Sequence, residues 1–162
     1  MVAASKMSTT CEMAWMVAEA HRRKLDMCAA LEDIADSLPA NVDALKCLSV
    51  ANALVPLLRE IHHFEESVVF PIFEARRTGG AYALSAQRLR AEHVEDQAYA
   101  EELTEALMAI GHGAQVSNPE AVGFMLRGFF ESTRRHVAFE REHVLPVIAA
   151  ADSIGRSEPR AG

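Results

Sequence analysis

The sequence predicts an all-α fold, an up-down-up-down antiparallel four-helix bundle. Half of the 162 residues are apolar, which is enough for a substantial core, and only 8 glycines and 6 prolines interrupt the chain. Aromatic and β-branched residues are sparse relative to Ala, Leu, Met, Glu and Arg, a balance that favours helices over strands. Four long segments with helical periodicity are separated by short breaks, so consecutive helices should pack antiparallel within one domain.

The first two helices are delimited by capping residues and a proline. The first is expected to begin at residues 8–10, where Ser or Thr can cap it, and to end at Leu38. Pro39 sets that end because the residue before a proline avoids helical geometry. The second helix is expected to begin at Asn41, a good N-cap, and to run to about Arg77.

Proline and glycine also mark breaks inside and after the second helix. Pro56 and Pro71 lie within it, so we expect a kink or an early end there. The run Thr-Gly-Gly at residues 78–80 should stop the helix completely.

The last two helices have clear boundaries as well. The third is expected over about residues 82–110, where Gly-His-Gly at 111–113 ends it. The fourth opens with Asn118 as N-cap and Pro119 in the first turn, the favoured arrangement, and runs to about Ala151.

These boundaries predict a single bundle domain with a short flexible segment on each side. The domain should span residues 10–151. A flexible N-terminus would occupy residues 1–9, and a flexible polar tail containing Gly and Pro would occupy residues 152–162.

Charge and cysteine content exclude several classes of function. The formal charge is −7 with acids and bases interspersed, which argues against a nucleic-acid partner because phosphate binding needs a basic face. Cys11, Cys28 and Cys47 form no CxxC pair, which argues against a disulfide framework and a thiolate zinc site. Reduced thiols, with no apolar run long enough for a signal peptide or membrane span, favour a cytoplasmic protein without a membrane partner.

Helical phase turns four of the seven histidines toward the core, one on each helix. Residues three, four or seven apart share a helix face, and apolar residues at these spacings surround each of the four. The inward-facing histidines are His21, His62, His93 and His136. Glu66 and Glu140 lie on the same inner stripes, each four residues after a histidine.

Metal ligation accounts best for these buried polar groups. A single core histidine usually has an ordinary hydrogen-bond partner, but an isolated buried carboxylate costs several kcal/mol or changes its pKa. No Lys or Arg is expected on the inner stripes to pair with Glu66 and Glu140. A cation would satisfy carboxylates and imidazoles together, and the i,i+4 spacing sets two side chains about 5–6 Å apart, within reach of one centre. Histidine and carboxylate suit iron, manganese and zinc alike.

With these residues the chain resembles the hemerythrin-like family, also called HHE cation-binding domains. The resemblance covers residues 14–149. It rests on His21 in Glu-Ala-His-Arg-Arg-Lys-Leu, the His62/Glu66 pair before Val-Phe-Pro, His93 in Ala-Glu-His-Val-Glu-Asp, and the His136/Glu140 pair before Val-Leu-Pro. The resemblance implies a four-helix bundle around two iron ions joined by an oxo or hydroxo bridge. It also implies that Glu66 and Glu140 bridge the irons and that the histidines cap them.

The sequence departs from the oxygen-carrying members of that family at one ligand. Those members have a fifth histidine on the third helix, four residues from the other histidine of that helix. Here the positions four residues from His93 are Leu89 and Gln97. His63 and His143 are candidate substitutes: His143 shares the face of the fourth-helix pair, whereas His63 lies on a more polar face.

The carboxylate of the second helix is open between two neighbours. Glu66 repeats the i+4 spacing of His136 and Glu140, and it is the expected ligand. Aligning the two motifs on their closing prolines instead pairs Glu65 with Glu140.

The expected ligand set leaves room for a small molecule. Each iron would have two imidazole nitrogens, two carboxylate oxygens and a bridging oxygen, so an octahedral iron keeps one free position. A histidine-rich set carries less negative charge than the carboxylate-rich ExxH sites, which favours binding or sensing of O2 or NO. The alternatives are an enzyme acting on peroxide or NO, an iron donor for iron–sulfur cluster repair, or a metal-free helical interaction module. Any protein partner is unknown.

Overall fold

The protein is almost entirely helical in the computed structural model, which describes the backbone of residues 9–75 and 81–155. No strand occurs in these two ranges. The elements are α1 (Thr9–Ser37), α2 (Ala44–Phe64), η1 (Glu65–Val69), α3 (Phe70–Ala75), α4 (Ala81–Gly111), α5 (Pro119–Phe139), η2 (Glu140–Val144) and α6 (Leu145–Gly155). The Thr-Gly-Gly stop at residues 78–80 and most of the two expected flexible ends lie outside the described residues. Of those ends only Thr9 and residues 152–155 are described, and they belong to the helices α1 and α6.

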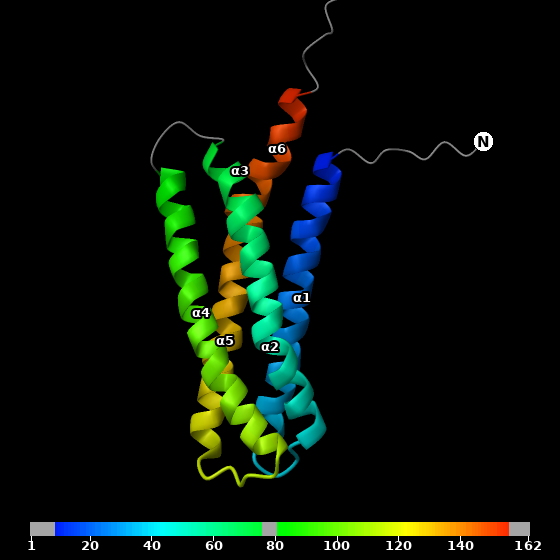
Figure 1. The fold of residues 1–162 in the computed structure, drawn as a ribbon, viewed down its shortest axis with the longest axis vertical. Helices are drawn as coiled ribbons and strands as arrows, with labels where there is room; N and C mark the ends of the chain where they lie inside the picture. Colours follow the sequence, from blue (N-terminus) through cyan, green and yellow to red (C-terminus); the bar gives the residue numbers. More distant parts are fainter. Residues whose placement is uncertain (1–8, 76–80, 156–162) are drawn as a thin grey trace, which may run out of the picture.

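The helices form four rods that lie along one long axis. In Figure 1 the chain runs down α1, up α2, down α4 and up α5. The helix α1 packs against α2 and α5, and α4 packs against the same two helices. The short helix α3 continues the rod of α2, and α6 continues the rod of α5. Both lie at the end of the bundle where α1 begins (Figure 1).

Helix starts follow the capping rules, although one cap differs from the expected residue. Asn118 caps α5 as predicted, and its side chain accepts a hydrogen bond of 3.0 Å from the Ala121 amide. The prediction that Asn41 caps the second helix is wrong, because α2 starts three residues later at Ala44. Asp43 is the cap, since its carboxylate accepts from the Lys46 amide at 3.1 Å.

Two π-helical turns interrupt the second and fourth rods at matching places. Each begins at a glutamate, Glu65 in η1 and Glu140 in η2, and each is followed within two residues by a proline. The second helix does not end early at Pro56 or Pro71, because the helical backbone continues through both to Ala75. A π turn adds a residue to the turn and so changes which side chains face inward beyond it.

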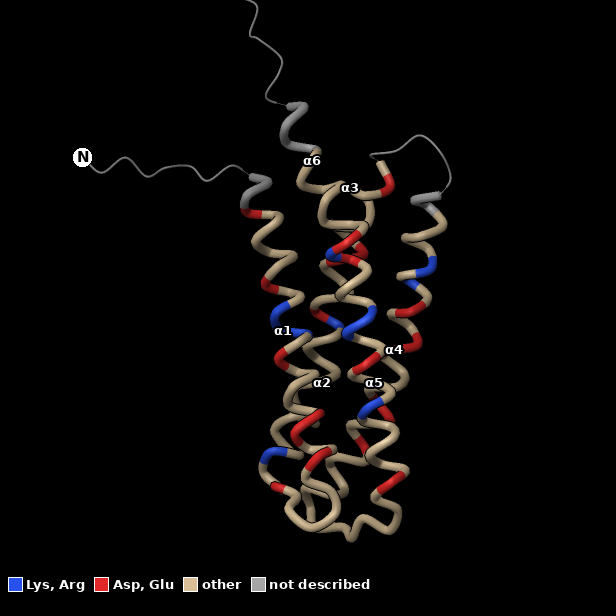
Figure 2. Tube along the Cα trace, turned by 180° about the vertical axis from the view of Figure 1, so that it is seen from behind, with Lys and Arg blue, Asp and Glu red and all other residues tan. Residues whose placement is uncertain are grey.

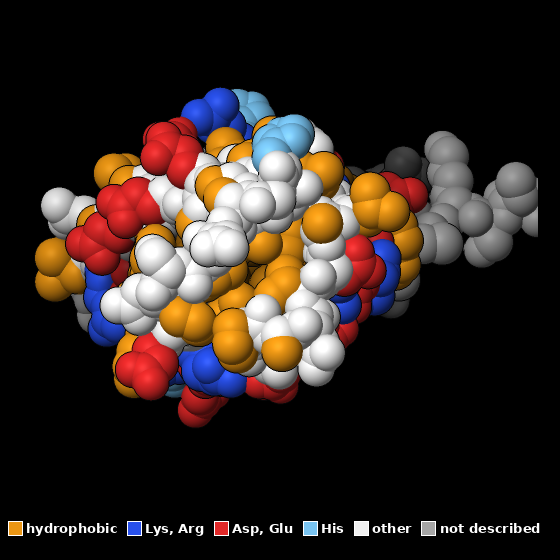
Figure 3. Space-filling model, turned by 90° about the horizontal axis from the view of Figure 1, so that it is seen from below, with side chains coloured by type: hydrophobic (Ala, Val, Ile, Leu, Met, Phe, Trp, Pro, Cys, Tyr) orange, Lys and Arg blue, Asp and Glu red, His pale blue; other side chains and the backbone are white. Residues whose placement is uncertain are grey.

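The interior has a polar layer between two apolar clusters. The lower apolar cluster includes Cys28, Leu31, Leu54, Leu103, Leu126 and Phe129, and the upper one includes Val17, Phe70, Phe73, Leu89, Val144 and Ile148. Figure 3 looks onto the lower end and shows hydrophobic side chains gathered at its centre. The polar layer consists of His21, Lys24, His62, Glu65, His93, Asp96, Thr133, His136 and Glu140, all buried. Charged residues of both signs are spread along the rods (Figure 2).

Candidate metal centre

All four predicted inward-facing histidines lie in the polar layer, one from each rod. His21, His62 and His93 are at most 2% exposed, and His136 is 5% exposed. Burial follows from phase, because each histidine sits on the apolar stripe of its helix between residues of the two apolar clusters. The periodicity of the sequence therefore predicted the burial of these imidazoles.

Four side chains of this layer converge on one point. Glu65, His93, His136 and Glu140 each offer one ligand atom, and these atoms all lie within 4.8 Å of one another. Nε2 of His93 is 3.2 Å from Oε2 of Glu65, and Nε2 of His136 is 3.4 Å from Oε1 of Glu140. Two imidazoles and two carboxylates in one buried group are a ligand set that suits a divalent transition metal.

Atoms without hydrogen-bond partners mark the same point. Nε2 of His93, Nε2 of His136 and Oε1 of Glu140 are buried and have no hydrogen-bond partner among the described residues. Buried polar atoms are normally paired, and leaving one unpaired costs about 1–3 kcal/mol. These three atoms all belong to the four-residue group, so the residues present fit a bound cation.

Two carboxylates accept hydrogen bonds from the Nδ1 atoms of His93 and His136, on the opposite side of each ring from Nε2. Nδ1–H of His93 donates to Glu66 at 2.7 Å, and Nδ1–H of His136 donates to Glu92 at 3.1 Å. A proton on Nδ1 leaves the lone pair of Nε2 free to bind a metal. Glu66 and Glu92 therefore fix both the tautomer and the ring orientation that ligation requires.

The placement of the second-helix carboxylate differs from the expectation. Glu65 is buried, at 2% exposure, and joins the four-residue group, whereas the side chain of Glu66 is 40% exposed. The prediction that Glu66 lies on the inner stripe is wrong because the π turn η1 begins at Glu65 and changes the helical phase there. Glu140 faces inward as predicted, since it is the first residue of its own π turn.

The expectation that no Lys or Arg reaches the inner stripes is also wrong. Lys24 is buried, and its Nζ donates to both oxygens of Glu65 at 2.7 and 2.9 Å. The same Nζ lies 3.7 Å from Oε2 of Glu140. Lys24 follows His21 by three residues on α1, so the i,i+3 rule would have placed it in this layer.

The remaining two histidines of the layer contact the group from its edges. Nε2–H of His21 donates to Oε2 of Glu140 at 2.9 Å. The ring of His62 stacks on that of His93, with centroids 3.8 Å apart and planes 4° from parallel. Burial, together with the neighbouring His93 and Lys24, lowers the pKa of His62 to about 2, so its imidazole is neutral.

Charge in the layer is set by opposing effects. Burial alone would raise the pKa of Glu140, but the Lys24 ammonium and the imidazoles of His136 and His21 outweigh it and hold that pKa well below its ordinary value. Burial alone would lower the pKa of Lys24, but the Glu65 and Glu140 carboxylates raise it. Lys24 is therefore an ammonium and Glu140 a carboxylate at neutral pH.

Comparison with known proteins agrees with this centre. The family model of the hemerythrin HHE cation-binding domain matches residues 13–148, which is most of the chain. The chain belongs to the hemerythrin HHE family. No curated protein and no solved structure matches it. The family is one of cation-binding domains, and the buried His/Glu group of this hemerythrin-like chain could hold the cation.

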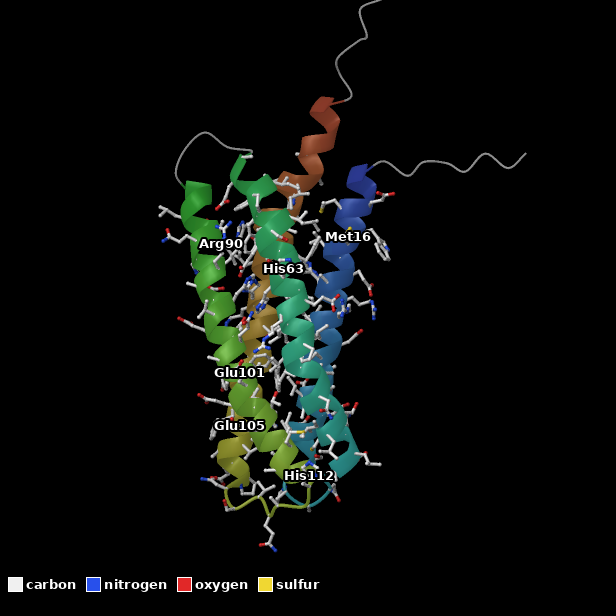
Figure 4. The ribbon with its side chains drawn as sticks, viewed as in Figure 1. Met16, His63, Arg90, Glu101, Glu105 and His112 are labelled. Carbon is white, nitrogen blue, oxygen red and sulfur yellow. The ribbon has the colours of Figure 1, made fainter. Side chains whose placement is uncertain are left out.

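The substitutes considered for the fifth histidine of hemerythrins do not lie in the buried group. His63 is exposed on α2, and Figure 4 labels it with His112, which lies at the far end of the bundle. The His143 side chain is 49% exposed and packs against Phe139, with ring centroids 4.6 Å apart. Of the two positions four residues from His93, Leu89 is buried in the upper apolar cluster. The other, Gln97, has its amide nitrogen 3.2 Å from Nδ1 of His62.

One pocket reaches the hemerythrin-like centre from outside. Its volume is about 270 Å³, and it opens between α4 and α5. Polar residues dominate its lining, which includes Arg88, Glu92, Arg135 and His136. Arg88 donates to Glu92 at 2.7 Å, and Glu92 in turn holds His136. The pocket therefore touches the ligand group only at His136, while Glu65, His93 and Glu140 stay enclosed. None of the described helices has the length and apolar composition needed to cross a membrane.

Proposed function

We propose that this chain is a non-haem iron protein that binds or senses a small diatomic gas, O2 or NO, at the His/Glu centre. The observation that carries the proposal is the convergence of Glu65, His93, His136 and Glu140, three of which each have a buried atom without a hydrogen-bond partner. Membership of a cation-binding family supports a metal at this place.

The balance of ligands supports iron and a gas. Imidazole and carboxylate together suit ferrous and ferric iron. When bound, ferrous iron supplies reducing electrons and an open coordination position at which a diatomic molecule can bind. Four protein ligands leave such a position in an octahedral sphere. The two-iron form implied by the family resemblance would additionally draw on His21 and His62 at the edges of the group.

Enclosure of the group supports a small ligand over a large one. Three of its four members are at most 2% exposed, and Phe70 stacks on the His93 ring with centroids 5.4 Å apart. The pocket at His136 is polar and, at about 270 Å³, smaller than sites that enclose organic substrates, which take about 300–1,000 Å³. A diatomic gas is small enough to reach the centre from the His136 side alone.

Metal analysis of protein purified without an affinity tag tests the proposal. We expect iron in the wild type and its loss in His93→Ala and Glu140→Ala. The exposed histidines supply matched controls, because His63→Ala and His143→Ala should keep the metal. Glu66→Ala should retain the site but weaken metal affinity by about 10–100-fold, since it removes only the support of His93.

The gas-binding part of the proposal needs its own measurement. Anaerobically reduced protein is mixed with O2 or NO, and the absorption spectrum is followed in stopped flow. A stoichiometric adduct that is absent from His93→Ala supports gas binding. If the protein contains iron but forms no adduct with O2 or NO, the gas-binding proposal is wrong. Turnover of added peroxide or NO would favour the enzymatic alternative.

A metal-free bundle is the second candidate, and one observation favours it. Lys24 pairs with Glu65 and approaches Glu140, so both buried carboxylates have a cationic neighbour without any metal. In that case the chain would act as a helical interaction module. The same metal analysis decides between the two candidates, because the module predicts no bound iron in wild type.

A further inference from the structure

The ammonium group of Lys24 lies close to two of the buried carboxylates, those of Glu65 and Glu140. Its Nζ contacts both oxygens of Glu65, at 2.7 and 2.9 Å, and lies 3.7 Å from Oε2 of Glu140. His21 donates to that same Oε2 of Glu140 at 2.9 Å. Three of the four carboxylate oxygens therefore already have a donor, and Oε1 of Glu140 is the one that has no hydrogen-bond partner.

Three of the buried atoms without a hydrogen-bond partner converge on one point of the layer. Oε1 of Glu140 belongs to the same convergent group as the free Nε2 atoms of His93 and His136. The two histidines that a second ion would require are outside that group. Nε2 of His21 is hydrogen-bonded to Glu140, and its buried Nδ1, which has no hydrogen-bond partner, is not part of the convergent group. The His62 ring lies flat against the His93 ring.

The balance of charges in the layer also favours one metal ion over two. The layer holds three carboxyl groups, those of Glu65, Asp96 and Glu140, and one ammonium, Lys24, all of them buried. One divalent ion would bring the positive charges to three against at most three negative ones. Two divalent ions would bring them to five against at most three negative ones, in a place that water does not screen and where like charges repel strongly.

We infer that Lys24 takes the place of a second metal cation, so that the centre holds one metal ion per chain instead of the pair that its family resemblance implies. This inference rests on the proposed function, because it concerns the composition of the same centre. Lys24 acts here as a positioning residue: it binds the carboxylates from one side and leaves Oε1 of Glu140 directed at the two imidazoles.

Iron stoichiometry tests the inference. Apoprotein is loaded anaerobically with excess ferrous salt, freed of unbound metal by gel filtration, and analysed for iron per chain by mass spectrometry. We expect a ratio of one for the wild type. Lys24→Met keeps a similar side-chain length without the charge, frees both oxygens of Glu65, and should raise the ratio to two. Lys46→Met is the matched control, because Lys46 pairs with Asp33 on the surface, and its ratio should stay at one.

A second measurement on the wild type covers the case in which Lys24→Met does not fold. After oxidation, an isolated ferric ion gives a paramagnetic resonance signal, whereas a coupled ferric pair is silent; we expect the signal to account for all the bound iron. A wild-type ratio of two, or a ratio that stays at one in folded Lys24→Met, overturns the inference and leaves the proposed function intact. No bound iron in the wild type overturns the proposed function and the inference with it.

Discussion

The polar layer and the lower apolar cluster span the same four rods with opposite chemistry. In the apolar cluster, side chains such as Leu54, Leu103 and Leu126 are fully buried, and they have no polar atoms that require a hydrogen-bond partner. In the polar layer, every charged group requires a specific partner, and four buried atoms still have no hydrogen-bond partner: Nδ1 of His21, Nε2 of His93, Nε2 of His136 and Oε1 of Glu140. The apolar cluster is complete as it stands, while the polar layer keeps unpaired atoms that a cation could satisfy. Stability and chemistry are therefore located in different parts of one bundle.

This difference has an energetic basis. Burying apolar side chains stabilises the fold by about 1.5–3 kcal/mol each, without regard to which partner they meet. Burying charges costs several kcal/mol per ion before pairing, and the pairing rarely gives a net gain. The polar layer is held in place by the apolar clusters above and below it.

The largest expected effect separates the two parts directly. Phe129 is 1% exposed in the lower apolar cluster and makes an edge-to-face contact with Tyr99. We expect Phe129→Ala to lower the free energy of unfolding by about 3–5 kcal/mol, because it leaves a cavity, and to keep the wild-type iron content per folded chain. Urea unfolding and metal analysis of the folded fraction measure both quantities.

A control on the same helix sharpens that result. Phe124 is 77% exposed on α5, so Phe124→Ala should change the free energy of unfolding by less than about 0.5 kcal/mol. If folded Phe129→Ala loses its iron, the two parts of the bundle are coupled and the comparison above does not hold.

A middle-sized effect comes from a titratable group inside the apolar cluster. Burial raises the pKa of Cys28 to about 11. An unfolded thiol ionises near pH 8.5–9, so the stability that Cys28 contributes is fully present below that range and is lost as the pH rises through about 11. At about 1.4 kcal/mol per pKa unit, the loss is about 3 kcal/mol.

Alkaline unfolding curves of wild type and Cys28→Ala measure this effect. The free energy of unfolding of the wild type should fall between pH 9 and 11 by more than that of Cys28→Ala. Other groups that titrate at alkaline pH, such as Tyr99, whose pKa burial raises, contribute equally to both proteins and cancel. Parallel curves for the two proteins would show that the Cys28 thiol does not resist ionisation.

Helical periodicity predicted the four histidines and Glu140 of the polar layer, but it did not predict which of Glu65 and Glu66 faces inward. The four histidines were predictable because each lies on a regular α-helical stripe before any π turn begins. Glu65 and Glu66 could not be separated by phase, since η1 changes the number of residues per turn at that point. The repeated proline was the available signal, because aligning the two motifs on Pro71 and Pro146 pairs Glu65 with Glu140.

Lys24 illustrates an error of a different kind. Its spacing from His21 places it on the inner face, so the geometry was present in the sequence. The expectation failed because a lysine is almost never fully buried without a partner, and the partner, Glu65, lies on another helix 41 residues away. A contact between distant segments of this kind is visible only in the folded chain. The predicted helical fold depended on periodicity within single helices, and the predicted hemerythrin HHE family depended on the order and spacing of the four motifs; both are confirmed.

The smallest expected effect tests whether the lower end of the bundle can be weakened without disturbing the centre. Asp43 caps α2, and Asp43→Ala should lower the free energy of unfolding by about 1 kcal/mol, because the Lys46 amide loses its acceptor. Asn41→Ala should have almost no effect, since Asn41 lies before the helix and is exposed. The cap is 19 residues before His62, or about 28 Å along the helix, so fraying at Asp43 should leave the iron content unchanged. Hydrogen exchange should then be faster in the first turn of α2 and not around His62; faster exchange at both ends would mean that the helix, and with it the polar layer, unfolds as one unit.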